Sequence, residues 1–552
     1  MIAIDDRTTI GDAFFRAAAA YGANSLFAVP ANEARAYLPR GLELRYDTAA
    51  VAVQALIERY RAAGYGPGHR IGLFLENRPE HVLHKFALNA LGACCVPINP
   101  DYRAGELAFL IDHSKVDLVV ALESRMAALQ AALAEASAKP GVVAVEEFDA
   151  VLPPAVSPPS AAAPTAETPA SILYTSGTTG RPKGCVLSHR YELAAGAWYA
   201  TRGGMAEIRD GQDRIYNPLP LFHVNASILS LYCALLTGSC QVQTDRFQPS
   251  RWWDEVRGSR ATVVHYLGVV VPLLLAQPPS ERDREHCVRF GFGAGAEPQL
   301  HAQFEQRFGF PLIELWGMTE IVRALVANVA PRQVGTRAFG RAVPGLEARV
   351  VDEGGAEAAD GAPGELVVRH SAATPRKDFF SCYLDDEAAT EAAWAGGWFH
   401  TGDVVTRSPD GMLHFVDRRK NIIRRSGENI AAAEVEAMLL THPRVRQVAV
   451  MPVADEIREE EVLACVVLND PPAGGSPADE TASGAAVSRS LFDHCLANLA
   501  YYKAPGWIWI TDSIPTTGTQ KIQKHRIFAA GTDPRRLEGI VDLRAFKKRS
   551  AG

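Results

Sequence analysis

The stretch Tyr174-Thr175-Ser176-Gly177-Thr178-Thr179-Gly180-Arg181-Pro182-Lys183-Gly184 carries the strongest signal in the chain. Its glycines let the backbone approach a polyphosphate closely, and its N–H and hydroxyl groups can donate to phosphate oxygens. Lys183 adds a positive charge for the outer phosphates. The stretch is not the GxxxxGK[ST] loop, because Gly184 follows Lys183. Taken alone, these residues fit a phosphate-binding loop or a plain polar loop between two strands.

Short apolar strands alternate with amphipathic helices on both sides of this stretch. The pattern predicts strands at 44–46, 70–75, 95–98, 261–264 and 288–292, and helices at 48–63 and 80–91. Such alternation predicts crossover units and a largely parallel sheet. The Pro- and Ala-rich segment 153–170 predicts a surface connection.

The pattern changes after Gly364, where the strands become shorter. It predicts a strand at 364–369, a hairpin turn at 408–411 and a strand at 412–416. Beyond Lys420 it predicts helices at 431–441 and 490–499 and strands at 445–453 and 460–468, with a Gly/Pro/Ser-rich interruption at 470–485. We therefore expect two domains, residues 1–419 and 420–552, with a hinge near Lys420.

The composition bounds the function classes. A chain of 552 residues is too long for one ordinary core, and 47% hydrophobic with 22% charged residues is typical of a globular protein. A net charge of -7 and a pI of about 6.1 argue against nucleic acid as a partner. The basic segment Lys547-Lys548-Arg549 is expected to be a solvated terminus.

Cysteine spacing and apolar runs give no sign of a metal framework or a membrane anchor. The nine cysteines form no CxxC pair, so neither a zinc site nor a disulfide framework is indicated. The N-terminus lacks a basic segment followed by an apolar one, and runs such as 266–276 fall short of the roughly 20 residues of a membrane span. We expect a cytoplasmic protein without a membrane span.

Residues 175–184 resemble the phosphate-loop signature of the adenylate-forming superfamily of acyl-CoA synthetases, adenylation domains and luciferases. Further stretches resemble the family's motifs in the family's order: PLPLFH at 218–223, GAGAEP at 293–298, ELWGMTE at 314–320, GWFHTGD at 397–403, DRRK at 417–420 and TTGTQKI at 516–522. The resemblance implies an α/β fold. It has a large N-terminal domain of mixed and parallel sheets with helices and a small β-barrel-like part, followed by a small mobile α+β C-terminal domain. It also implies an ATP-dependent carboxylic acid–CoA ligase that uses ATP, Mg²⁺ and coenzyme A.

The resemblance assigns an ATP site. Trp316 would stack on adenine where the family usually has Tyr, although a core Trp is the alternative. Thr319 would donate to the α-phosphate, and Glu320 would hold the Mg²⁺ that bridges phosphate oxygens. Asp403 would accept the ribose hydroxyls, unless it is only a turn residue, and Arg418 would reach the ribose or phosphate. The remaining ATP-binding candidates are Thr175, Ser176, Gly177, Thr178, Thr179, Gly180, Lys183, Gly295, Ala296, Glu297, Gly317 and Met318.

The resemblance also implies a two-step mechanism. Lys521 would stabilise charge on the bridging oxygens while the carboxylate attacks the α-phosphorus, although Lys524 could substitute on the sequence alone. The small domain would then turn about the hinge residue Lys420 and bring a CoA-side loop, Ser426, Gly427 and Glu428, to the thiol. Asp417 stands where the family often has Gly.

The substrate-pocket candidates are His223, Tyr266, Gly268 and Gly293. Amino-acid-activating relatives usually place an Asp just after the Phe of the PLPLFH motif, and here His223-Val224-Asn225 follows. The acid is therefore expected to be a small to medium carboxylate without an α-amino group. GAGAEP, WGMTE and TGTQKIQK are similar to crotonobetaine/carnitine–CoA ligases, whose betaine tail could use cation–π contacts with Trp316, Phe222 or Tyr266.

Two other functions fit the same residues. One is an acyl-AMP ligase that delivers its acyl group to a carrier protein or an amine. The other is a non-enzymatic ATP-binding scaffold, in which Lys521 and Glu320 would have no chemical role. The sequence leaves a homodimer open.

Overall fold

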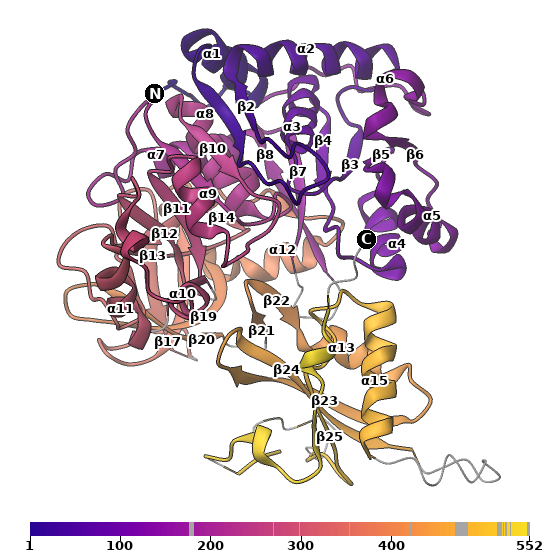
Figure 1. Ribbon diagram of the computed structural model, residues 1–552, viewed down its shortest axis with the longest axis vertical. Helices are drawn as coiled ribbons and strands as arrows, with labels where there is room; N and C mark the ends of the chain where they lie inside the picture. Colours follow the sequence, from indigo (N-terminus) through magenta and orange to yellow (C-terminus); the bar gives the residue numbers. More distant parts are fainter. Residues whose placement is uncertain are drawn as a thin grey trace.

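The computed structural model describes residues 1–175, 182–268, 270–296, 298–352, 354–418, 422–469, 484–515, 522, 524, 527–529 and 531–548. Figure 1 shows a large domain and, below it, a smaller domain in orange and yellow. The predicted fold class is confirmed: mixed α/β sheets, a half-barrel sheet and a smaller C-terminal domain. Among the described residues, no helix has the length and apolar character needed to cross a bilayer.

Two large sheets form the main body of the large domain. The first has the order β18(Cys382–Tyr383), β8(Lys183–Ser188), β7(Pro169–Thr175), β4(Cys94–Pro97), β3(Arg70–Phe74), β5(Leu118–Ala121) and β6(Gly141–Ala144). The second has the order β14(Ile321–Val326), β13(Leu312–Met318), β12(Phe290–Ala294), β11(Val263–Leu267), β9(Arg214–Asn217), β10(Cys240–Gln243), β1(Ser25–Val29) and β2(Leu42–Arg45). Their central strands are parallel, as the alternation predicted. The edge strands β18, β14 and β2 are antiparallel to their neighbours, and the edge strand β6 is parallel to β5.

Helices connect and cover these sheets. The large-domain helices are α1(Ile10–Tyr21), α2(Tyr46–Ala62), α3(Pro79–Leu91), α4(Ala104–Ser114), α5(Met126–Glu135), α6(Phe148–Val151), α7(His189–Ala200), α8(Leu231–Thr237), α9(Trp252–Gly258), α10(Val270–Leu275), α11(Pro298–Phe308) and α12(Glu387–Ala393). A π-helix, η3(Asn225–Ser230), precedes α8. One continuous core joins the two sheets through α3, α7 and α8.

Local signals account for several helix ends. Thr9 and Asp12 form a capping box at the start of α1. Pro79 opens α3, where a missing N–H costs nothing, and Gly92 ends it with a φ of 77°. These residues position α3 directly before the buried strand β4.

A third sheet and the small domain complete the chain. The half-barrel sheet has the order β15(Ala338–Gly340), β20(Leu413–Arg418), β19(Phe399–Arg407), β17(Gly364–Arg369) and β16(Glu347–Val351). The small domain has the order β22(Glu428–Ala431), β21(Ile422–Arg425), β24(Glu459–Leu468), β25(Trp507–Ile510) and β26(Ile540–Asp542), with β23(Val445–Asp455) paired to β24. Its helices are α13(Ala432–Leu440) and α15(Gly484–Asn498), and it has a core of its own.

Two expectations need correction. Lys547 is not a solvated tail residue, because its side chain is fully buried and pairs with Glu461. Arg425 donates from Nε to the other carboxylate oxygen of Glu461 at 2.8 Å, so the C-terminal segment is tied to the end of β21. The helix predicted at 490–499 is α15, which spans Gly484–Asn498 and so begins at Gly484 rather than at 490.

Candidate active site

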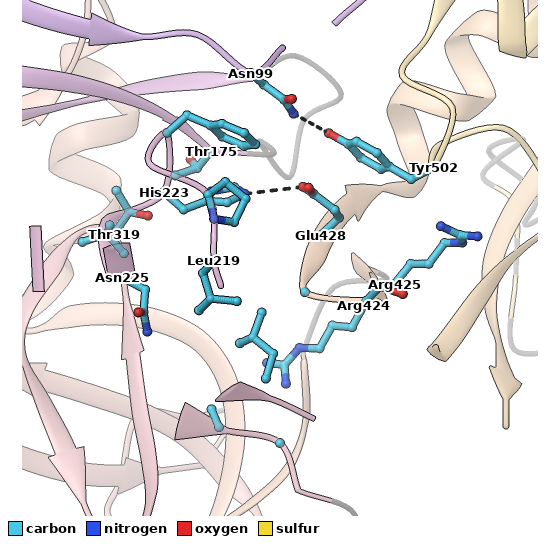
Figure 2. A pocket seen from close by; sticks show the side chains of 18 of the residues that line it. Asn99, Thr175, Leu219, His223, Asn225, Thr319, Arg424, Arg425, Glu428 and Tyr502 are labelled. Carbon is cyan, nitrogen blue, oxygen red and sulfur yellow. Dashed lines mark hydrogen bonds and ion pairs between the residues drawn. The ribbon is translucent and has the colours of Figure 1, made fainter. Parts of the chain in front are cut away.

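A cleft of about 2940 Å³ lies between the two domains. Thr175, Lys183, Thr319 and Glu320 line it from the large domain, and the Ser426–Glu428 loop lines it from the small domain. Figure 2 shows His223 and Thr175 on one side, with Glu428, Arg424 and Tyr502 on the other. The structure therefore gathers motifs from both domains at one place.

The phosphate-loop motif starts and ends at this cleft. Thr175 ends β7 and Lys183 begins β8, and the two residues are directly paired across the strands. Lys183 Nζ lies 4.6 Å from the centroid of the Tyr383 ring. Ser176, Gly177, Thr178, Thr179 and Gly180 lie outside the described residues. The described ends of the loop thus place Lys183 in the cleft.

Thr319 and Glu320 form the turn between β13 and β14. The Tyr191 hydroxyl donates to the Thr319 carbonyl at 2.7 Å, and the Tyr383 hydroxyl donates to Glu320 Oε1 at 2.8 Å. Burial, followed by the nearby Glu320 carboxylate, raises the pKa of Tyr383, so its hydroxyl remains a donor. The Glu320 carboxylate is held in place at the wall of the cleft.

Trp316 and Asp403 are joined by a hydrogen bond. Trp316 Nε1 donates to Asp403 Oδ2 at 2.8 Å, and both residues are buried. Asp403 on β19 lies opposite Arg418 on β20, so the backbones of the two ribose candidates are neighbours. Gly317 and Met318 follow Trp316 along the exposed end of β13.

The predicted adenine-side loop is held by a buried carboxylate. Glu314 accepts hydrogen bonds from Gly295 N at 2.9 Å and from Ala296 N at 3.2 Å, and Tyr266 donates to it through its hydroxyl. Burial raises the pKa of Glu314. Gly295 has a φ of +84°, which favours glycine, while Glu297 lies outside the described residues.

The acid-pocket candidates line the cleft, but not in the way expected. The Tyr266 side chain is only 1% exposed, so it presents no open ring face to a cation. A Cβ on Gly293 would lie 2.2 Å from the Tyr266 carbonyl oxygen, and one on Gly268 would lie 2.1 Å from the Gly295 carbonyl oxygen. These glycines allow backbone segments to pack closely.

The CoA-side loop enters the same region from the small domain. Ser426 and Gly427 have φ values of +52° and +84° and connect β21 to β22 as a two-residue hairpin turn. A Cβ on Gly427 would lie 2.2 Å from Leu267 Cδ1, and Glu428 Oε2 lies 3.5 Å from His223 Nε2. The loop therefore faces the acid-pocket motifs directly.

Of the two candidates for the catalytic lysine, the structure describes Lys524 but not Lys521. Lys521 and the hinge residue Lys420 lie outside the described residues, and so does the side chain of Arg418. Lys524 donates to the Val450 carbonyl at 2.7 Å and pairs with Glu436 at 2.7 Å. Lys524 is thus engaged within the small domain.

Comparison with known proteins matches both domains. Residues 27–376 match the AMP-binding enzyme family, and residues 434–521 match the AMP-binding enzyme C-terminal domain. The chain belongs to the AMP-binding enzyme family. This AMP-binding enzyme is 30% identical over 477 residues to crotonobetaine/carnitine–CoA ligase of Escherichia coli O17:K52:H18, a match that covers 83% of the chain and 88% of that relative.

Solved structures share the complete fold. A double mutant of o-succinylbenzoate–CoA synthetase (MenE) from Bacillus subtilis, bound to the product analogue OSB-NCoA, has a TM-score of 0.78 at 21% identity and covers 94% of the chain and 98% of that structure. MenE in complex with AMP has a TM-score of 0.64 at 22% identity, covering 95% and 99%. The amide bond synthetase McbA from Marinactinospora thermotolerans has a TM-score of 0.76 at 25% identity, covering 94% and 99%.

These relatives identify this AMP-binding enzyme as an AMP-forming acyl-CoA synthetase. Sequence reasoning missed two of its site residues, Tyr383 and Glu314. Glu314 interrupts the apolar stretch 312–316, which is a sign that a buried carboxylate has a specific partner. Tyr383 has no such local sign, because its partner Glu320 is 63 residues away.

Proposed function

We propose that the enzyme couples a carboxylic acid to coenzyme A in two steps. The acid attacks the α-phosphorus of ATP to give acyl-AMP and pyrophosphate, and the CoA thiol then displaces AMP to give acyl-CoA. The observation that supports this most is the Ser426–Glu428 loop, which lies against Leu267 and His223 in the cleft that also holds Lys183, Thr319 and Glu320.

We propose that the cleft residues of the large domain, together with Lys521, carry out the first step, adenylation. Lys183 would contact the outer phosphates and Thr319 the α-phosphate, while Lys521 would stabilise charge on the bridging oxygens. Trp316 would contact adenine, and Asp403 with Arg418 the ribose. The loop residues Ser176, Gly177, Thr178, Thr179 and Gly180 would donate to the phosphates.

Mg²⁺ fits this wall. Among the described residues, no three His, Cys, Asp or Glu side chains gather into a metal-ligand cluster, but Glu320 offers a buried carboxylate in the cleft that Lys183 and Thr319 also line. Mg²⁺ is commonly bound by one or two carboxylates together with substrate phosphates. When bound at Glu320, it would neutralise charge on the phosphates.

We propose that the domain arrangement of this structure is the one that carries out the second step, thioester formation. The small domain, residues 420–552, would turn about Lys420 and replace Lys521 by the Ser426–Glu428 loop, where Gly427 allows close passage of the pantetheine arm. The higher TM-score with the product-analogue complex of MenE than with its AMP complex supports this assignment.

We propose an acid of small to medium size without an α-ammonium group. No carboxylate stands at 223–225, where an ammonium would need one, since a buried unpaired charge costs several kcal/mol. The close packing at Gly268 and Gly293 favours a short acyl group over a long chain. Amide formation with an amine acceptor is the second candidate, because McbA has the same fold at 25% identity.

The test separates the two half-reactions. Purified enzyme with ATP, Mg²⁺ and a panel of acids should release pyrophosphate, and thioester should form only when CoA is added. Lys521→Ala should lose roughly 10²–10³-fold in pyrophosphate release, while thioester formation from supplied acyl-AMP is largely kept. Lys524→Ala is the matched control. Amide but no thioester in the presence of both acceptors would overturn CoA as the acceptor.

A further inference from the structure

A buried hydrogen-bond network next to the cleft joins residues of β9, β10, β11 and the π-helix η3. Asn217, Gln241, Gln243, His265 and Ser230 are all fully buried. Gln243 Nε2 donates to the Leu219 carbonyl at 2.8 Å, and Gln241 Nε2 donates to Gln243 Oε1 at 2.9 Å. Ser230, on the π-helix η3, donates to Gln241 Oε1 at 2.8 Å. A network this well satisfied holds its members in single orientations.

The network fixes the amide orientation of Asn217. Its Oδ1 must be the oxygen, because it accepts from the Leu219 backbone N–H at 3.0 Å. Asn217 Nδ2 therefore donates, to Ser230 Oγ and to Asn225 Oδ1, both at 2.9 Å. A backbone N–H can only donate, so this assignment does not depend on how either amide is drawn.

His265 contacts the same oxygen of Asn225. Burial lowers the pKa of His265 to about 3, so the imidazole is neutral and carries one N–H. Tyr199 OH lies 3.0 Å from Nε2, and Asn225 Oδ1 lies 2.7 Å from Nδ1. Because Asn225 Oδ1 can only accept, the N–H of His265 is on Nδ1 and donates to it, and Nε2 accepts from the Tyr199 hydroxyl. The Asn217 contact places the oxygen of Asn225 toward the network, and His265 donates to that same oxygen.

The NH₂ group of Asn225 is consequently turned away from the network. Asn225 is partly exposed and lines the cleft, and Figure 2 shows it on the cleft wall below Thr319. In the described part of the chain, Asn225 Nδ2 donates to no other group. It is an oriented hydrogen-bond donor in a cleft that the apolar residues Val224, Leu229 and Ala294 also line.

We propose that Asn225 Nδ2 donates to an acceptor atom on the acyl group, so that the preferred acids carry a carbonyl, ether or hydroxyl oxygen away from the carboxylate. This inference rests on the proposed function, since it concerns the acid that the ligase would activate. It narrows the range of preferred acids, because a plain alkyl acid leaves the Asn225 donor unpaired and an ammonium group is repelled by it. Asn225 is thus a specificity residue, and Asn217 and His265 are positioning residues.

The first experiment needs no variant. Dissociation constants of matched acids are measured by titration calorimetry, with pyrophosphate release recorded in parallel. The pairs are pentanoate with its 3-oxo and 4-oxo forms, and cyclohexanecarboxylate with its 4-oxo form and with tetrahydropyran-4-carboxylate. At least one oxygen-bearing acid should bind about tenfold more tightly than its hydrocarbon partner. Equal binding in every pair overturns the proposal, whether or not pyrophosphate is released.

The second experiment changes the donor alone. Asn225→Asp keeps an oxygen for Asn217 and His265 but replaces the donor that faces the cleft by an acceptor. The preference for oxygen-bearing acids should vanish, and 5-aminopentanoate should gain affinity. Ser227→Ala is the control, because Ser227 lies on the same π-helix and its buried hydroxyl donates to the His223 carbonyl. If Asn225→Asp keeps the native preference, the donor lies elsewhere and the proposal is wrong.

Discussion

Lys85 and Lys503 are both buried lysines bound to glutamates, but their partners come from different parts of the molecule. Lys85 on α3 pairs with Glu192 on α7 at 2.8 Å, and both side chains are fully buried in the large domain. Lys503 belongs to the small domain and pairs with Glu434 of its own α13 at 2.7 Å and with Glu106 of α4 in the large domain at 2.6 Å.

The Lys85–Glu192 pair is a permanent contact, because both residues belong to one domain. The Lys503–Glu106 pair is a conditional contact, because it depends on how the two domains are arranged. Burial alone would lower the pKa of Lys503, and the two glutamates outweigh it, so the pKa is raised. Lys85 keeps its partner in every domain arrangement, whereas a rotation of the small domain must break the bond between Lys503 and Glu106. The Lys85–Glu192 pair thus lies wholly within the large domain, whereas the Lys503–Glu106 pair joins the two domains and exists only in the present arrangement.

Acid should affect the large domain first and most strongly. Burial lowers the pKa of His81, His84 and His265 to about 3, whereas His442 and His494, the small-domain histidines that the structure describes, are partly exposed. In the unfolded chain each of these histidines has the ordinary pKa of about 6.5 and binds a proton below that pH. Stability should therefore fall as the pH drops from about 6.5 towards 3, by up to about 5 kcal/mol per histidine.

Urea unfolding from pH 7 to pH 4, combined with peptide-resolved hydrogen exchange, measures this loss. Protection should be lost around α3 and β11 before it is lost in β23 and β24. A small domain that opens at a higher pH than the large one would contradict the comparison.

Removal of the permanent contact should cost stability. Lys85→Met leaves the Glu192 carboxylate buried without its counter-charge, and such losses typically cost about 3–5 kcal/mol. Urea unfolding at pH 7 measures the change. The double variant Lys85→Met/Glu192→Leu should recover most of it, and a loss below about 1 kcal/mol in the single variant would show that the pair contributes little.

Removal of the conditional contact should affect the reaction more than stability. Glu106→Gln removes one charge-assisted hydrogen bond of Lys503, worth about 1.5–3 kcal/mol, but only in this arrangement. Thioester formation should slow by roughly tenfold, while pyrophosphate release and urea unfolding of the large domain change little. Asp385→Asn, which removes the exposed pair with Lys115, is the control. Equal slowing of both half-reactions would mean that the contact is not tied to one arrangement.

The smallest effect on stability and activity is expected from the hydrogen bond between Trp316 and Asp403, within the large domain. Trp316→Phe keeps an aromatic ring but removes the N–H that donates to Asp403. The free energy of unfolding should fall by about 1 kcal/mol, and the KM for ATP should rise more than kcat falls. Trp394→Phe is a matched control, since Trp394 is equally buried at 5% and does not line the cleft. An unchanged KM would exclude a role for this bond in nucleotide binding.

The sequence by itself determined the family, the order of the motifs and most of the elements. β17 spans the predicted residues 364–369, and the strands that flank the phosphate loop end at Thr175 and begin at Lys183. Such features depend on residue periodicity and on Gly and Pro positions within a few residues of each other. For the same reason the loop Ser426–Glu428 could be located from its glycine and its motif.

Only the tertiary structure decided which polar groups are buried and with what partners. Lys547 is predicted to be solvated, yet it is buried beside Glu461, 86 residues away. From the sequence, Asn225 shows only that no aspartate stands at this position. In the structure its amide is oriented by Asn217 and contacted by His265, which lies 40 residues further along the chain. A polar side chain is stable in the interior only where distant parts of the chain supply its hydrogen bonds. No local pattern encodes that pairing, because it exists only once the sheets and the domains have packed together.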